Sequence, residues 1–139
     1  MILLVIGLLL RRYFPLHILA DSKTVVKTIG NLLFIIYGLV AVPTVIQMIR
    51  HKTTFTTHGC TTKLITRGFF CYSRNPLYLS LLIVMAAIAS YSNSLWLLFL
   101  LPVLILALNR FVIVHEEKYL EEKFGDDYLN YKRKVRRWI

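Results

Sequence analysis

The chain has 139 residues, of which 57% are hydrophobic and 17% are charged, and its net charge is +10. A soluble domain is normally about 45–50% apolar and about 25% charged, so this composition excludes an ordinary soluble protein. At about 20 residues per span, the length predicts a single domain over residues 1–139 with three or four transmembrane helices, and it leaves no room for a separate soluble catalytic domain.

The first two apolar segments differ in length. Met1–Leu10 ends at two arginines and gives roughly 15 Å of helix, which cannot cross about 30 Å of hydrocarbon without snorkelling or tilted neighbours. We predict a marginal first span, and the lack of a basic start and of a small-residue cleavage site argues against a removed signal peptide. Thr28–Ile49 is uncharged over 22 residues and predicts a full span, with Pro43 tolerated as a kink.

The third apolar segment, Leu77–Asn109, is uncharged over 33 residues and is too long for one helix. The polar group Tyr91–Ser94 divides it, which predicts a helical hairpin whose two ends lie on one side of the membrane. The basic segments that flank the hairpin, residues 50–74 and 110–139, hold 13 of the 17 bases. The positive-inside rule therefore places both segments, and with an even number of spans also the N-terminus, in the cytoplasm.

The last segment alternates acids and bases with apolar residues at helical spacing. It predicts an amphipathic helix, broken near Gly125, that lies against the bundle or the membrane surface. The apolar positions are Tyr119, Leu120, Phe124, Tyr128, Tyr131 and Val135. The fold class that we expect is an all-α, multi-pass integral membrane protein with about four transmembrane helices and a cytosolic amphipathic C-terminal helix.

Charge and residue types exclude several functions. The bases flank apolar segments, which favours contact with membrane lipids over a nucleic-acid partner. The spans 28–49 and 77–109 contain no ionisable side chain, which argues against an ion-coupled carrier. Cys60 and Cys71 form no CxxC pair and are expected as reduced thiols, and the four histidines show no zinc spacing, so we expect no metal site.

Two polar motifs remain as candidate sites. Ser73–Tyr78 places Asn75 to cap a helix and Pro76 at its first position, and the free amides there, with Arg74, would suit the carboxylate of a small ligand. The alternative is a simple helix start. His115-Glu116-Glu117 follows the last span, where the carboxylates are either functional or solvated at the interface. Arg110 precedes Glu117 by seven residues, which predicts the same helix face.

Together, the two motifs and the hairpin between them carry a resemblance. The residues that carry it are Leu64–Leu79, then Asn109-Arg110-Phe111, Glu116-Glu117, Phe124-Gly125, Tyr128, Tyr131 and Val135–Trp138. The resemblance is to the isoprenylcysteine carboxyl methyltransferase-like family, which is related to the phospholipid methyltransferases. The resemblance covers roughly residues 53–139. It implies a membrane enzyme that binds S-adenosylmethionine on the cytosolic side of the inner or plasma membrane and methylates a lipophilic or isoprenylcysteine-like acceptor.

The resemblance also implies site residues. Arg110 and Glu117 are the candidates for catalytic roles, with Arg110 acting on the acceptor, and Arg74 joins the cofactor site. The remaining cofactor contacts carry over by position to Thr62, Lys63, Leu64, Ile65, Phe70, Asn75, Pro76, Leu77, Tyr78 and Glu116.

Three positions depart from the eukaryotic enzymes of the family. Asn75 replaces a His, Phe70 replaces a Tyr, and Val112 replaces an Arg that meets the substrate carboxylate, with Arg110 as the nearest substitute. Two other functions stay open: an NADPH-dependent sterol-reductase-like enzyme, and a non-catalytic membrane protein whose basic tail binds lipid. The sequence identifies neither the methyl acceptor nor the oligomeric state.

Overall fold

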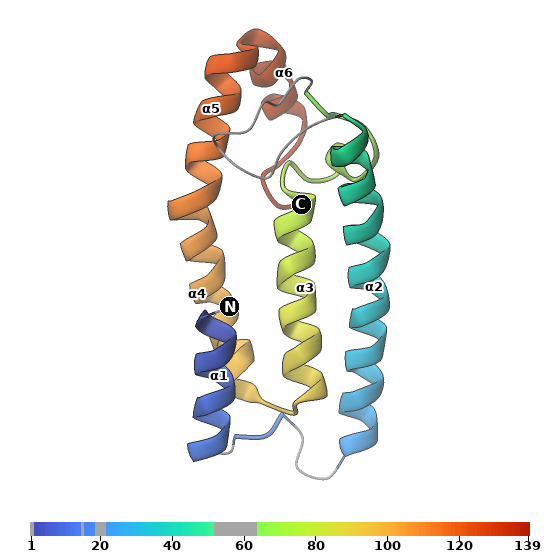
Figure 1. Ribbon diagram of the computed structural model, residues 1–139, viewed down its shortest axis with the longest axis vertical. Coiled ribbons are helices and arrows are strands. Elements are labelled where there is room, and N and C mark those ends of the chain that lie inside the picture. Colours follow the sequence, from blue (N-terminus) through green and yellow to red (C-terminus); the bar gives the residue numbers. More distant parts are fainter. Residues whose placement is uncertain (1, 15, 19–21, 52–63) are drawn as a thin grey trace. The chain divides into compact units, whose positions relative to one another are not determined.

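The computed structural model describes residues 2–14, 16–18, 22–51 and 64–139, and these ranges contain helices and no strand. The all-α prediction is therefore confirmed. The elements are α1 (Ile2–Tyr13), α2 (Lys23–Arg50), the 3₁₀-helix η1 (Gly68–Cys71), α3 (Pro76–Tyr91), α4 (Leu95–Leu108), the π-helix η2 (Asn109–Ile113), α5 (Val114–Phe124) and α6 (Asp126–Lys134) (Figure 1).

Within the described ranges, two helices are long and apolar enough to cross a membrane. They are α2, with 28 residues, and the continuous helix Leu95–Phe124, with 30 residues, which joins α4, η2 and α5. In the most apolar stretch of each, only 17% and 11% of the residues are buried, whereas the core helix of a soluble protein would be mostly buried. Exposed apolar surface of this extent indicates a membrane protein. α3 has 16 residues and α1 has 12, so a count of four spans stays a prediction.

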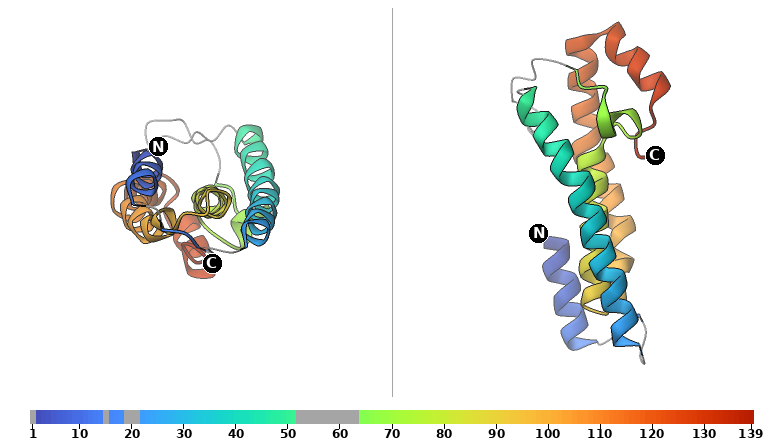
Figure 2. Two further views of the ribbon diagram at one scale, coloured as in Figure 1. Left: turned by 90° about the horizontal axis from the view of Figure 1, so that it is seen from below. Right: turned by 90° about the vertical axis from the view of Figure 1, so that its right-hand side faces the viewer.

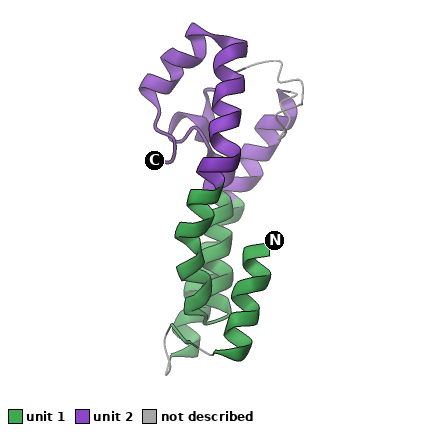
Figure 3. Cartoon of the chain, turned by 90° about the vertical axis from the view of Figure 1, so that its left-hand side faces the viewer, with its two compact units in different colours: residues 1–38, 80–107 green, residues 39–79, 108–139 purple. Residues whose placement is uncertain are grey.

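The contacts divide the chain into two compact units (Figure 3). Unit 1 holds residues 1–38 and 80–107, and unit 2 holds residues 39–79 and 108–139. In unit 1, α3 lies between α2 on one side and the pair α1 and α4 on the other (Figure 2). Met85 and Ala89 of α3 and Leu97 of α4 form its buried core.

The predicted hairpin is present in unit 1. α3 ends at Tyr91 and α4 begins at Leu95, and the turn between them holds Asn93 at φ +48°. Asn tolerates this left-handed conformation better than most residues. Gly30 of α2 packs closely on the same end of α3, because a Cβ there would lie 3.2 Å from the backbone nitrogen of Tyr91.

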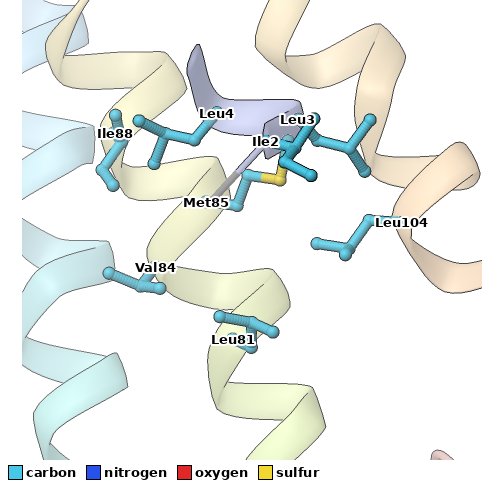
Figure 4. A pocket seen from close by; sticks show the side chains of 8 residues that line it. All are labelled: Ile2, Leu3, Leu4, Leu81, Val84, Met85, Ile88 and Leu104. Atoms are coloured by element: carbon cyan, nitrogen blue, oxygen red, sulfur yellow. The ribbon is translucent and has the colours of Figure 1, made fainter. Parts of the chain in front are cut away.

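Unit 1 also contains an apolar cavity of about 360 Å³ (Figure 4). α1, α3 and α4 line it with Ile2, Leu3, Leu4, Leu81, Val84, Met85, Ile88 and Leu104.

Unit 2 holds the polar motifs. α5 ends before Gly125, whose φ of +51° suits glycine, and α6 follows directly. The break near Gly125 is therefore confirmed. The six apolar residues of the predicted amphipathic pattern are all buried or half-buried, and Tyr128 and Tyr131 are the most buried of them.

Candidate active site

The start of α3 is held by the C-terminal segment. α3 begins at Pro76 as predicted, so Asn75 occupies the capping position. The Asn75 side-chain amide donates to the carbonyl of Arg137 at 3.0 Å, and the Ser73 hydroxyl donates to the same oxygen at 3.2 Å. The backbone N–H of Arg74 donates to the carbonyl of Arg136 at 3.0 Å. Residues 73–75 are thus fixed by a segment more than 60 positions away in the sequence.

Glu117 is a buried carboxylate between two guanidinium groups. Arg137 binds it in a bidentate manner, with Nε 3.0 Å from Oε1 and Nη2 2.7 Å from Oε2. Arg74 Nη1 lies 3.0 Å from Oε1. The side chains of Arg74 and Glu117 are 10% and 8% exposed, whereas that of Arg137 is 34% exposed. Because a buried charge must be paired, this cluster ties α5, the α3 start and the C-terminal segment together.

Glu116 points to a different partner. The hydroxyl of Tyr78, two residues into α3, donates to Glu116 Oε2 at 3.1 Å. The hydrogen bond joins the two sequence motifs across 38 positions. The two adjacent glutamates therefore differ in environment, since Glu117 is neutralised by arginines, whereas Glu116 accepts its hydrogen bond from a neutral hydroxyl.

Tyrosines of α6 support the other side of the site. The hydroxyl of Tyr131 donates to the carbonyl of Phe70 at 2.7 Å, which positions η1. Tyr128 is 1% exposed, and burial, together with the nearby charge of Glu117, raises its pKa to about 12, against the effect of a hydrogen bond with Arg74.

A small cavity of about 30 Å³ lies where these elements meet. Its lining combines two aromatic rings, one carboxylate, one guanidinium and the first turn of α3. The lining residues are Met48, Phe70, Arg74, Asn75, Pro76, Leu77, Tyr78 and Glu116. Arg74 Nε is buried and has no hydrogen-bond partner among the described residues, so the cavity wall carries an unsatisfied cationic donor.

The structure gathers most of the predicted site residues, but not all. Seven of them line this cavity, whereas Leu64 and Ile65 do not. Thr62 and Lys63 lie outside the described residues. Glu117 lies beside the cavity and is already paired with arginines. Its catalytic role and that of Arg110 stay predictions.

Arg110 lies within the π-helix η2, Asn109–Ile113, so its seven-residue spacing from Glu117 does not predict a shared face as it would in a regular α-helix. A π-helical turn holds an additional residue, so a spacing of seven no longer returns to the same face. Arg110 is accordingly exposed while Glu117 is buried.

Two contributors to the site had no assigned role in the sequence analysis. Met48 of α2 lines the cavity, and Arg137 holds both Glu117 and Asn75. For Arg137, the Val135–Trp138 motif is the sequence feature that indicates a role for the C-terminal segment in the site. For Met48, the sequence analysis found no such feature.

The fold and these contacts define a class: a helical membrane protein with a polar site where a helix start meets a carboxylate pair. The chain belongs to the phospholipid methyltransferase family, whose model matches residues 25–127. This confirms the resemblance and identifies a membrane methyltransferase. A protein of Haemophilus influenzae described as an uncharacterized protein is 51% identical over 65 residues, which are 45% of this chain and all of that protein. No solved structure matches.

Proposed function

We propose that this protein transfers a methyl group from S-adenosylmethionine to an amphiphilic acceptor at the cytosolic interface of the membrane. The observation that carries the proposal is the cavity in which Asn75–Tyr78 and Glu116 meet, because it joins two sequence motifs that both lie within residues 25–127, the part of the chain that matches the methyltransferase family. The excess of bases in residues 50–74 and 110–139 supports a cytoplasmic site in an inner or plasma membrane.

The residues of the cavity fit the chemistry of this cofactor. The unsatisfied Arg74 Nε suits a carboxylate, the Glu116 carboxylate suits a cation or a hydroxyl, and Phe70 offers an aromatic face. The cavity of about 30 Å³ is far smaller than a nucleoside, so binding requires movement of lining side chains such as those of Met48 and Tyr78.

The chain's own residues have to position the reacting molecules rather than to exchange protons with them. S-adenosylmethionine, when bound, supplies its methyl group from a positively charged sulfur, and such a transfer depends mainly on alignment of the reacting atoms. Glu116 would bind the cofactor with Oε1, while Tyr78 fixes Oε2. Glu117, held by two guanidinium groups, is better suited to brace Arg74 than to exchange protons.

The acceptor is proposed to be lipophilic or lipidated. α2 and α4 expose apolar side chains along most of their length, so an acceptor with a long tail would approach from the bilayer. Arg110 is exposed, as a group that meets an acceptor arriving from outside the helices would be. Val112, where eukaryotic relatives place an Arg, makes a prenylcysteine carboxylate only one of several possible acceptors.

Calorimetric titration of S-adenosylhomocysteine into the detergent-purified protein tests the proposal. Glu116→Gln removes one charge and keeps the shape, so we expect affinity to fall by about 1.5–3 kcal/mol, roughly 10- to 150-fold. Tyr78→Phe removes one neutral hydrogen bond and should cost about 0.5–1.5 kcal/mol.

Glu122→Gln is the matched control on the same helix, because its side chain is 68% exposed and pairs only with the exposed Lys118 among the contacts described. It should leave affinity unchanged. Binding of NADPH in place of S-adenosylhomocysteine, or unchanged affinity in a folded Glu116→Gln protein, would contradict the proposal.

A further inference from the structure

A second polar cavity lies in unit 1 and shares no lining residue with the cavity at Glu116. It measures about 320 Å³ and is formed where α1 ends, α2 begins and α3 ends. Four basic side chains line it: Arg11, His17, Lys23 and Lys27. Its remaining lining is Val26 and the polar run 90–93, and no carboxylate lines it among the described residues.

Among the described residues, the cations of this cavity have no counter-charge. No ion pair joins Arg11, Lys23 or Lys27 to an acid in the part of the chain that the structure describes. The sequence offers only Asp21 nearby, against four bases in residues 11–27. Lys23 and Lys27 are four residues apart on α2 and so project from one helix face. Like charges gathered in one cavity repel each other, and an anion placed among them relieves that repulsion.

The cavity is held in shape by hydrogen bonds. Phe14 and residues 16–18, which include His17, are fixed to Asn93 and to the start of α4 by three hydrogen bonds. Asn93 Oδ1 accepts from the N–H of Ile18 at 2.9 Å, the N–H of Leu95 donates to the carbonyl of Leu16 at 3.1 Å, and Trp96 Nε1 donates to the carbonyl of Phe14 at 2.7 Å. The backbone on either side of His17 is thus held in place before a ligand arrives.

Apolar side chains are exposed on the same helix ends. Leu8 and Leu9 of α1 are 37% and 50% exposed, and Val25 and Ile29 of α2 are 49% and 44% exposed. In a membrane protein such side chains contact acyl chains. The volume is also near the lower end of small-molecule sites, about 300–1,000 Å³, and is larger than a single inorganic phosphate requires.

We propose that this cavity binds the phosphate headgroup of an anionic phospholipid, with the acyl chains against the exposed apolar side chains of α1 and α2. The shared chemistry is a phosphate anion, which a lipid and free phosphate both supply. The positive-inside rule does not account for these bases, because the predicted orientation places the start of α2 on the side opposite residues 50–74. A lipid headgroup accounts for them.

The test uses dihexanoyl-phosphatidylglycerol, a short-chain probe, titrated into the full chain in neutral detergent at low salt. Dihexanoyl-phosphatidylcholine and inorganic phosphate are the comparison ligands, and the readouts are calorimetric affinity and the thermal unfolding midpoint. The double variant Lys23→Gln/Lys27→Gln removes two cations of the cavity. Arg12→Gln is the matched control, because Arg12 is the exposed neighbour of Arg11 and does not line the cavity.

We expect phosphatidylglycerol to bind and to raise the unfolding midpoint, whereas phosphatidylcholine and phosphate do not. Each cation near a lipid surface contributes a factor of roughly five, so the double variant should bind about 25-fold more weakly, while Arg12→Gln binds normally. Without lipid, the unfolding midpoint of neither variant should fall below that of the unmodified chain, because removing cations from the cavity relieves repulsion. Equal binding of inorganic phosphate would assign the cavity to a free anion, and equal losses in Arg12→Gln would show a diffuse charge effect; either result overturns the proposal.

Discussion

Replacing Glu117 by Gln distinguishes a bracing role from a catalytic one. The substitution keeps the shape of the side chain but leaves the guanidinium of Arg74, which is 10% exposed, without a counter-charge. Removing one partner of a buried ion pair typically costs 3–5 kcal/mol, and because Gln still accepts one hydrogen bond we expect about 3 kcal/mol of lost unfolding free energy. Arg137 is 34% exposed, so solvent screens its share and Arg137→Met should cost only about 1 kcal/mol.

The assay is denaturant unfolding in micelles, paired with titration of S-adenosylhomocysteine at a temperature where each variant is folded. If Glu117 braces the site, Glu117→Gln should lose stability and cofactor affinity together, because Glu117 holds Arg74, which lines the cavity. If Glu117 is instead a catalytic carboxylate, the variant should lose turnover while its unfolding free energy and its cofactor affinity stay unchanged. If the unfolding free energy of Glu117→Gln lies within about 0.5 kcal/mol of that of the unmodified protein, Glu117 does not stabilise a buried Arg74 charge and the bracing role is refuted.

Three further predictions concern other parts of the chain. Gly30→Ala should destabilise unit 1 by about 1–3 kcal/mol because its Cβ meets backbone atoms at 3.2 Å, whereas Gly38→Ala, with nothing within 4 Å, should stabilise by up to about 1 kcal/mol; thermal unfolding of both checks this. Arg110→Met should leave S-adenosylhomocysteine affinity intact and lower transfer of labelled methyl groups into a membrane lipid extract, and unchanged transfer would remove Arg110 from the acceptor site. The pKa of Tyr128 is about 12 in the folded protein and near 10 in the unfolded chain. The stability that Tyr128 contributes is therefore complete below pH 10 and is lost as the pH rises towards 12. Tyr128→Phe should flatten this decline in unfolding free energy, and an unaltered pH profile would contradict the prediction.

The helical elements could be predicted because each depends on a local pattern. The uncharged run 28–49 lies within α2, Asn75-Pro76 marks the start of α3, and Gly125 ends α5. Hydrophobic periodicity, capping residues and glycine conformation act over a few residues and are therefore visible in a linear sequence.

The bracing of the site could not be predicted in the same way. The hydrogen bonds from Ser73 and Asn75 to the Arg137 carbonyl span more than 60 positions, and a backbone carbonyl has no signature in the sequence. Which of the two adjacent glutamates meets arginines and which meets Tyr78 depends on the rotation of α5. That rotation is set by η2, for which the residues 109–113 give no local signal.

The π-helical turn makes the long helix carry one residue more than regular geometry allows. Deleting a single residue within Asn109–Ile113 would restore regular turns and leave the face of α5 unchanged, because the π-helical turn absorbs its additional residue locally, so Glu116 would keep its hydrogen bond with Tyr78. Helix positions numbered forward from the α3–α4 turn are therefore offset by one residue from positions numbered back from Glu116 and Glu117. An acceptor-binding residue on this helix has to be found in related chains by the face it occupies and not by its number.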